Sequence, residues 1–151
     1  MEEKKVEIRI KRKEGCEDLP PPHYMSEGAS GMDIYADVEG EVVLNPGDIK
    51  LISAGFYMSI PIGYEVQVRP RSGLAIKHGI SIVNSPGTID SDYRGLVGII
   101  LINQGRDPFT IKRADRIAQM VVQKVIKANL EAVAELDDTV RAQGGFGHTG
   151  V

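Results

Sequence analysis

Apolar residues alternate with charged or polar ones over residues 6–11 and again over residues 65–69. A repeat of two residues is the pattern of a β-strand that buries one of its faces. Short apolar runs over residues 42–44, 98–102 and 120–125 predict further strands. The chain is therefore expected to consist mainly of short strands.

Turn-forming residues separate these strands. Glycine (17 residues) and proline (8 residues) are spread along the chain and do not collect in one linker. They recur at residues 45–48, 61–63 and 104–108, where Asn-Pro-Gly-Asp, Pro-Ile-Gly and Gln-Gly-Arg-Asp-Pro are typical turn sequences. Many short strands joined by such turns predict an all-β sandwich or barrel.

Helix signals are few. Ser72 is a suitable N-cap for a short helix through Ile76, which Gly79 would end. Residues 128–140 favour a helix by propensity, but their apolar spacing fits neither the helical nor the strand period. Periodicity alone leaves that segment undecided.

Composition places the chain among single-domain globular proteins. It has 151 residues, 42% apolar and 26% charged, with a net charge of −3 that gives no indication of nucleic-acid binding. Cys16 is the one cysteine, so no disulfide can form within the chain. The charged N-terminus lacks a signal peptide, and the longest apolar stretch, residues 96–102, cannot span a membrane. We therefore expect a cytoplasmic protein without membrane contact.

Five segments combine glycine, charge and unusual polar residues within this β pattern. Taken singly, each has an ordinary explanation as a turn, a capped helix, a strand edge or a Gly-rich terminal tail. The segments are residues 30–34, 69–74, 87–95, 113–120 and 141–150.

Three of these segments also have the composition of a phosphate-handling site. Arg71 and Ser72 at a helix start would form an anion site. Asp90 and Asp92 lie on a loop, where a carboxylate can activate water or hold a metal, or can simply bond to its own turn. Glycines over residues 141–150 would let backbone N–H groups approach phosphate oxygens, although no Walker A sequence is present.

In order and spacing, the five segments resemble the five motifs of the trimeric dUTP diphosphatase (dUTPase) family. The match is closest at residues 70–74, 87–93, 116–120 and 144–147, and the resemblance covers residues 29–150. It implies that residues 1–140 form an all-β subunit, a jelly-roll or distorted β-barrel with one short helix. It also implies a flexible Gly-rich arm over residues 141–151 and a homotrimer whose active sites are shared between subunits. Residues 128–140 would then contain a strand and the start of an arm, against their helical propensity.

The resemblance also implies a reaction. Enzymes of this family hydrolyse dUTP to dUMP and pyrophosphate, which limits uracil incorporation into DNA and supplies dUMP for thymidylate synthesis. Asp90 matches the general base that directs water in line at the α-phosphorus. Mg²⁺ is the implied cofactor, held mainly by substrate phosphates and water with no direct protein ligand. Asp33 matches a residue near the metal and its waters, and Arg116 matches one that braces the site.

The family's substrate contacts can be assigned residue by residue. Tyr93 would pack against deoxyribose and exclude a 2′-hydroxyl, and Phe146 would stack on the base. His148 could add a charge beside phosphate or merely face solvent. The phosphate-binding positions are Arg71, Ser72, Gly73, Gln119, Arg141, Gly145, Gly147, His148 and Thr149. The base and sugar positions are Asn84, Gly87, Ile89, Tyr93, Val97, Gly98 and Phe146.

Three alternatives were weighed against this interpretation. A dCTP deaminase shares the fold, but its chemistry needs a Glu where this chain has Ile100, which cannot transfer a proton. A non-catalytic nucleotide-binding trimer would not need an intact Asp90. A capsid-like jelly-roll with a structural role would not need Arg71, Arg116 and Arg141 together.

Overall fold

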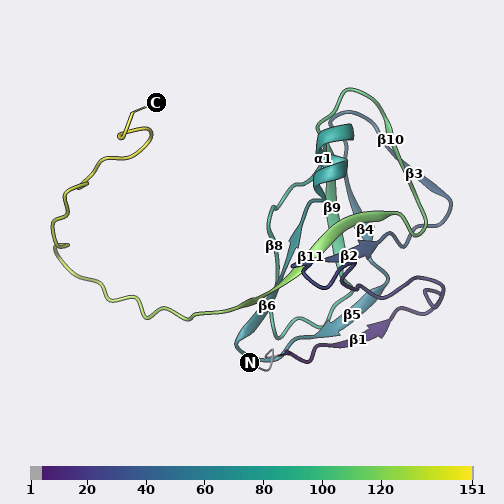
Figure 1. Ribbon diagram of the computed structural model, residues 1–151, viewed down its shortest axis with the longest axis horizontal. Coiled ribbons are helices and arrows are strands. Elements are labelled where there is room, and N and C mark those ends of the chain that lie inside the picture. The colour runs from purple at the N-terminus through teal and green to yellow at the C-terminus, as the bar shows by residue number, and fades with distance from the viewer. Residues whose placement is uncertain (1–4, 151) are drawn as a thin grey trace.

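The computed structural model describes residues 5–150, which form short strands and, within that range, one short helix (Figure 1). The nearly all-β architecture predicted from the sequence is confirmed. In chain order the elements are β1 (Arg9–Arg12), β2 (Met32–Tyr35), β3 (Glu41–Leu44), β4 (Ile49–Ser53), β5 (Phe56–Ser59), β6 (Tyr64–Arg69), α1 (Ser72–His78), β7 (Ile80–Ile82), β8 (Gly87–Ile89), β9 (Gly98–Asn103), β10 (Phe109–Lys112) and β11 (Arg116–Lys124).

The strands pair into four antiparallel groups around one core. The largest sheet has the order β2-β11-β6-β8, and a second has the order β4-β9-β7. The ribbons β3-β10 and β1-β5 complete a jelly-roll-like barrel (Figure 1). Side chains from different groups meet inside it, among them the buried Ile34, Leu44, Leu101 and Ile111. Burying each such side chain stabilises the fold by about 1.5–3 kcal/mol relative to leaving it exposed.

Strand β6 follows the alternation that predicted it. Val66 and Val68 are buried, while the other residues of the strand are partly exposed. Across the sheet these two valines face Val122 and Met120 of β11. One face of the β6–β11 pair therefore belongs to the core, and the other is free to carry polar groups.

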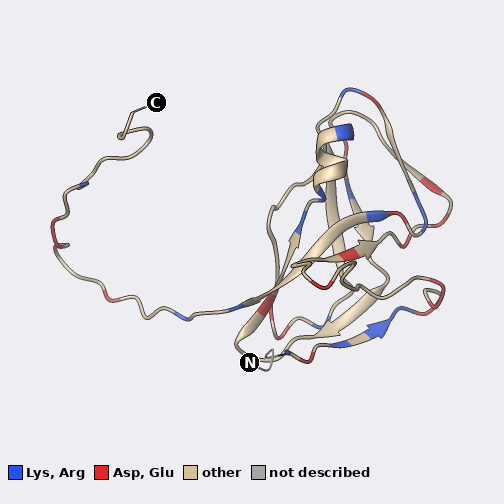
Figure 2. Ribbon diagram, in the orientation of Figure 1, with Lys and Arg blue, Asp and Glu red and all other residues tan. Residues whose placement is uncertain are grey.

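Strand β1 also forms where alternation predicted a strand, but without a buried face. It pairs with β5 alone, and all four of its residues are exposed. Ile10 keeps 42% of its surface accessible, whereas the preceding Ile8 packs against the core. The basic side chains of β1, blue in Figure 2, suit an edge strand, because charge discourages pairing with further strands.

The short helix predicted after residue 71 is confirmed, with one difference at its start. Ser72 is the first helical residue, and Arg71 occupies the cap position without a side-chain cap bond. Gly79 ends the helix in a left-handed conformation (φ 68°), and a Cβ there would lie 2.5 Å from the Gly105 nitrogen. Glycine is therefore required on both counts. No helix within residues 5–150 has the length and apolar content needed to cross a membrane.

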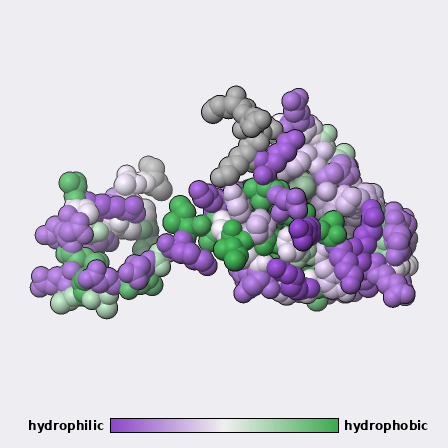
Figure 3. All heavy atoms as spheres, turned by 90° about the horizontal axis from the view of Figure 1, so that it is seen from below, coloured by the Kyte–Doolittle hydropathy of each residue, from purple (hydrophilic) through white to green (hydrophobic). Residues whose placement is uncertain are grey.

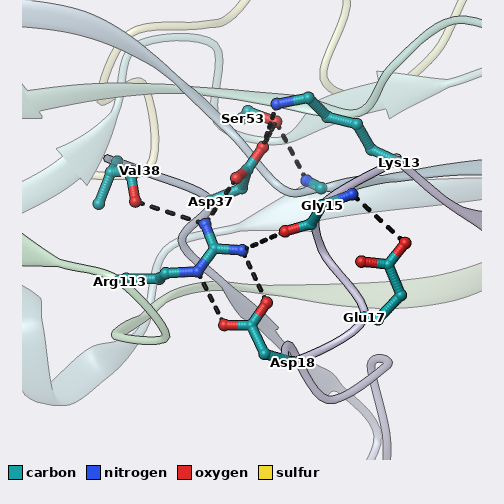
Figure 4. A network of polar contacts seen from close by, with 9 residues as sticks. Lys13, Gly15, Glu17, Asp18, Asp37, Val38, Ser53 and Arg113 are labelled. Carbon is teal, nitrogen blue, oxygen red and sulfur yellow. Dashed lines mark hydrogen bonds and ion pairs between the residues drawn. The ribbon is translucent and has the colours of Figure 1, made fainter. Parts of the chain in front are cut away.

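A network of ion pairs fastens the segment after β1 to the barrel (Figure 4). Arg113 binds both carboxylate oxygens of Asp18 at 2.8 Å and reaches Asp37 at 2.9 Å. The Lys13 ammonium and the Ser53 hydroxyl donate to the other Asp37 oxygen at 2.7 and 2.8 Å. Burial alone would raise the pKa of Asp37, but the bonds from Lys13, Ser53 and Arg113 hold it well below its usual range.

Beyond β11 the chain leaves the barrel. Residues 125–150 contain no helix or strand and extend away from the body (Figure 1). Neither the helix favoured by propensity nor the implied strand is present over residues 128–140. Val125 still donates to the Gly63 carbonyl at 2.8 Å, so the departure begins at Ile126, ahead of the arm predicted at residue 141. Apolar side chains remain exposed along this segment, as Figure 3 shows, and include Ile126, Leu130, Leu136 and Val140.

Candidate active site

Three of the predicted segments meet around one carboxylate. Asp33 on β2 has one oxygen 3.2 Å from Arg71 Nε and the other 3.1 Å from Arg116 Nη1. Arg71 also donates from Nη1 to the Arg116 carbonyl at 3.0 Å. The Asp33 side chain is only 14% exposed, so it fixes both guanidinium groups in place.

Gln119 is held at the same place by its main-chain surroundings. Its Nε2 donates at 2.9 Å to the carbonyl of Pro70, the residue that precedes Arg71. A Cβ on Gly31 would overlap Gln119 Oε1, so a side chain there would displace the Gln119 amide from this position. Gly31 lies in the first predicted segment but was not among the predicted site residues. Its closeness to Gln119 follows from the β2–β11 pairing, which one sequence does not reveal.

A cavity of about 200 Å³ lies against this cluster and is lined by Asp33, Arg71, Ser72, Gly73 and Gln119. Four of these are predicted phosphate-binding residues, and the fifth, Asp33, was predicted to lie near the metal and its waters. The first N–H groups of a helix have no partner within it, so the α1 start adds donors at Ser72 and Gly73. Paired arginines and free N–H groups make this a site suited to an anion.

The predicted base-binding residues gather elsewhere, between β8 and β9. Asn84, Gly87, Ile89 and Gly98 help to line a second cavity of about 60 Å³. Val97 lies beside it and is buried to 1% exposure. The two cavities have no lining residue in common. Within one chain the phosphate set and the base set are therefore separate.

Asp90 directly follows β8 and is exposed. Its main-chain oxygen accepts a bond from the Tyr93 N–H at 3.2 Å, which closes the turn. Its carboxylate makes no hydrogen bond or ion pair with any residue from 5 to 150. The side chain is thus not used to build the turn, and it remains available to water or ligand.

The Gly-rich terminal segment contacts neither cavity. Arg141 bonds only within the segment, from Nε to the Gly144 carbonyl at 2.7 Å. Phe146 is fully exposed, and the stretch that includes Gly145, Gly147, His148 and Thr149 extends away from the barrel (Figure 1). One chain therefore does not bring its predicted arm residues to its own cavities.

No group of three or more His, Cys, Asp or Glu side chains within residues 5–150 could hold a metal ion. The one carboxylate at the larger cavity, Asp33, has both oxygens engaged by arginines. Mg²⁺ prefers several oxygen ligands in octahedral geometry. The larger cavity therefore offers, among the described residues, no free carboxylate for a metal ion.

The fold and the site define a class: jelly-roll-like β proteins with a cavity lined by arginine and main-chain N–H groups at the start of a short helix. The chain belongs to the dUTPase family, whose model matches residues 17–150. It is 56% identical over 149 residues to the deoxyuridine 5′-triphosphate nucleotidohydrolase of Desulfotalea psychrophila, covering 99% of each chain. The enzyme of that name from Caldanaerobacter subterraneus subsp. tengcongensis is 55% identical over 146 residues, 97% of this chain and 99% of its own.

Solved structures agree on the fold. The Staphylococcus bacteriophage 80alpha dUTPase with dUPNHPP superposes with a TM-score of 0.86 at 25% identity, covering 96% of this chain and 99% of that chain. A dUTPase mutant from phage phi11 of S. aureus, described with a structural Mg(II) ion, gives 0.75 at 23% identity, covering 85% and 97%. At that identity the second likeness bears on the fold alone.

Proposed function

We propose that this chain hydrolyses dUTP to dUMP and pyrophosphate. The observation that carries the proposal is the cavity in which Asp33 fixes Arg71 beside Ser72, Gly73 and Gln119. Relatives that match almost the whole chain are named deoxyuridine 5′-triphosphate nucleotidohydrolases. The activity would keep uracil out of DNA and supply dUMP for thymidylate synthesis.

The phosphates of the substrate would occupy this cavity. Arg71 supplies charge and the guanidinium N–H groups that Asp33 and the Arg116 carbonyl do not use, and the helix start supplies the N–H groups of Ser72 and Gly73. The Gln119 amide adds a donor or acceptor whose position is set by Pro70. Because phosphoryl transfer depends mainly on positioning and charge stabilisation, fixed donors are what the reaction needs. Arg116 would act by holding Asp33, without touching substrate.

Uracil would be selected at the smaller cavity. The main-chain groups of Val97 and Gly98 would pair with its polar edge, with Asn84 assisting and Gly87 and Ile89 forming the wall. Cytosine would leave buried donors and acceptors mispaired, which is heavily penalised. An apolar wall discriminates one extra methyl group by only ~10–200-fold, so rejection of thymine needs a tight fit at C5. Tyr93 would pack on the sugar and exclude a 2′-hydroxyl.

Asp90 would act as the general base. Its exposed carboxylate, without a protein partner among the described residues, can bind a water and remove its proton. That water would attack the α-phosphorus in line, and pyrophosphate would leave from the opposite side. Mg²⁺, carried by the phosphates, would supply positive charge to the triphosphate.

A complete site would need more than one chain. The separate cavities and the outstretched residues 125–150 support a homotrimer with active sites at subunit interfaces. One subunit would give Asp90 and the base cavity, a second the Arg71 cavity, and a third its arm. In that arm Arg141, Gly145, Gly147, His148 and Thr149 would close over the phosphates. Phe146 would stack on the base.

Pyrophosphate release from dUTP, dCTP, dTTP and UTP with Mg²⁺, with a check for deaminated product, tests the proposal. We expect release from dUTP alone. Ile100 lines the base cavity with a side chain that cannot carry a proton, so no uracil product should form from dCTP. Uracil product would favour a deaminase, and no release from any of the four would favour a non-catalytic nucleotide-binding trimer.

A further inference from the structure

The ring of Tyr93 lies directly against Gly95. The Tyr93 hydroxyl donates to the main-chain oxygen of Leu96 at 3.1 Å. A Cβ on Gly95 would lie 2.5 Å from Tyr93 Cζ and 2.8 Å from Cε2, and would overlap the hydroxyl oxygen. Real Cβ atoms do not approach other atoms so closely, so the ring can hold this position only because residue 95 has no side chain.

The backbone at residue 95 does not itself require glycine. Its φ lies outside the left-handed region, in contrast to Gly79 and Gly147, whose φ values are 68° and 85°. An alanine could adopt the same main-chain conformation without strain. The missing Cβ therefore serves the tyrosine ring and not the turn.

The loop has its own supports, which do not depend on the ring. The Tyr93 N–H donates to the Asp90 carbonyl at 3.2 Å. Arg94 Nη1 donates to the carbonyl oxygens of Ser91 and Tyr93 at 2.7 and 3.1 Å. A side chain added at residue 95 would meet the far end of a flexible, 46% exposed tyrosine. The ring would be displaced while the loop backbone stayed in place.

We propose that Gly95 is a positioning residue that determines sugar specificity through Tyr93. By leaving room for the ring, it allows the hydroxyl to reach the Leu96 carbonyl and fixes the ring in one orientation. This inference rests on the proposed function, in which Tyr93 packs on deoxyribose. A tyrosine ring held by its Cβ at one end and by the bond to Leu96 at the other leaves no room beside the sugar for a 2′-hydroxyl. A displaced ring would leave that room and admit ribonucleotides.

The test compares Gly95→Ala with Gly28→Ala, a matched control in which the new Cβ meets no atom within 4 Å. For each we would measure kcat/KM with dUTP and with UTP. We expect the dUTP/UTP ratio to fall about tenfold or more in Gly95→Ala, the scale of steric discrimination by a pocket wall, and to stay unchanged in Gly28→Ala. Tyr93→Phe, which removes only the bond to Leu96, should lower the ratio in part. An unchanged ratio in both Gly95→Ala and Tyr93→Phe would overturn the proposal.

Two further measurements separate this role from a general effect on the loop. In a Tyr93→Ala background the Gly95→Ala change should have no further effect on the ratio, because the ring is gone. An equal loss in both backgrounds would overturn the proposal. A crystal structure of Gly95→Ala should show the Tyr93 hydroxyl moved away from the Leu96 carbonyl, and an unmoved ring would contradict it whatever the enzyme hydrolyses. Failure of the proposed function would instead appear as an unmutated protein that is inactive on dUTP.

Discussion

Two carboxylates that look alike in the sequence have different surroundings in the structure. Asp33 is 14% exposed and has both oxygens on arginines. Asp90 is exposed and has no side-chain partner among residues 5–150. A carboxylate that positions arginines must be bonded to them, whereas a general base must be free to bind water. Asp33 therefore holds Arg71 and Arg116 in place, and the Asp90 carboxylate is free for the water that its proposed role as general base requires.

Replacing Asp90 with Asn is predicted to lower kcat by about 10²–10⁴-fold, the usual contribution of a general base. Binding of dUTP should be nearly unchanged, because the amide keeps the size of the carboxylate. Asp92→Asn is the matched control, since Asp92 is exposed on the same loop and is not assigned to the site. Single-turnover kinetics with dUTP would measure both variants. Near-normal turnover by Asp90→Asn, or an equal loss in Asp92→Asn, would contradict the assignment.

The sequence could indicate which residue types matter, but not how close they come. Arg71, Ser72, Gly73 and Gln119 were all predicted as one phosphate-binding set, and they line one cavity. The close contact between Gly31 and the Gln119 side chain depends on strand pairing between segments far apart in the chain. A single sequence contains no information on that approach.

At the scale of elements, the strands with a clear apolar pattern were predicted, and others, among them the shortest, were missed. β6 and β9 have six residues each, enough to show a pattern, whereas β7 and β8 have three. Three residues cannot display a repeat of two. β11 also begins earlier than the apolar run from Met120 suggested, because its first residues pair with β2 across an irregular register near Arg116.

The ion network that fastens the segment after β1 predicts a pH dependence of stability. The pKa of Asp37 is held below its usual 3.8 in the folded protein. The carboxylate therefore contributes to the free energy of unfolding above about pH 4, and this contribution is lost as the pH falls from there towards the pKa of the folded state. The pKa of Asp18 is lowered in the same direction, chiefly by its bond from Arg113. Asp37→Asn should therefore be less stable than the unmutated protein at pH 7, by a margin that narrows below about pH 4.

Urea unfolding between pH 7 and pH 2.5 would measure this margin. Glu41→Gln provides the control, because the Glu41–Lys112 pair is 3.5 Å long and about 60% exposed on each side. Exposed pairs contribute little, so this variant should match the unmutated protein at each pH. If Asp37→Asn is as stable as the unmutated protein at pH 7, or if the difference in stability grows in acid, the network does not stabilise the fold as proposed.

At the scale of the whole molecule, the chain looks incomplete by itself. Its two cavities share no residue, and residues 125–150 carry exposed apolar side chains away from both. A soluble monomer seldom leaves an extended apolar segment uncovered. In the proposed homotrimer, the other two copies of the chain would cover it and bring the parts of the site together.

Removal of residues 141–151 tests the arm. We predict that turnover of dUTP falls below detection, because the donors of Arg141 and the Gly-rich stretch no longer reach the phosphates. The oligomeric state, measured by light scattering, should not change, since the barrel and residues 125–140 remain. A truncated protein with full activity would show that the arm has no part in catalysis.

Mixing two inactive variants tests the shared site most directly. Asp90→Asn keeps the arm, and the protein truncated after residue 140 keeps Asp90. If each site is built from several chains, unfolding and refolding the two together should restore hydrolysis of dUTP, because mixed trimers contain sites with an intact base and an arm from a neighbour. Restored pyrophosphate release is the result we predict. Mixed trimers that form and remain inactive would contradict the account.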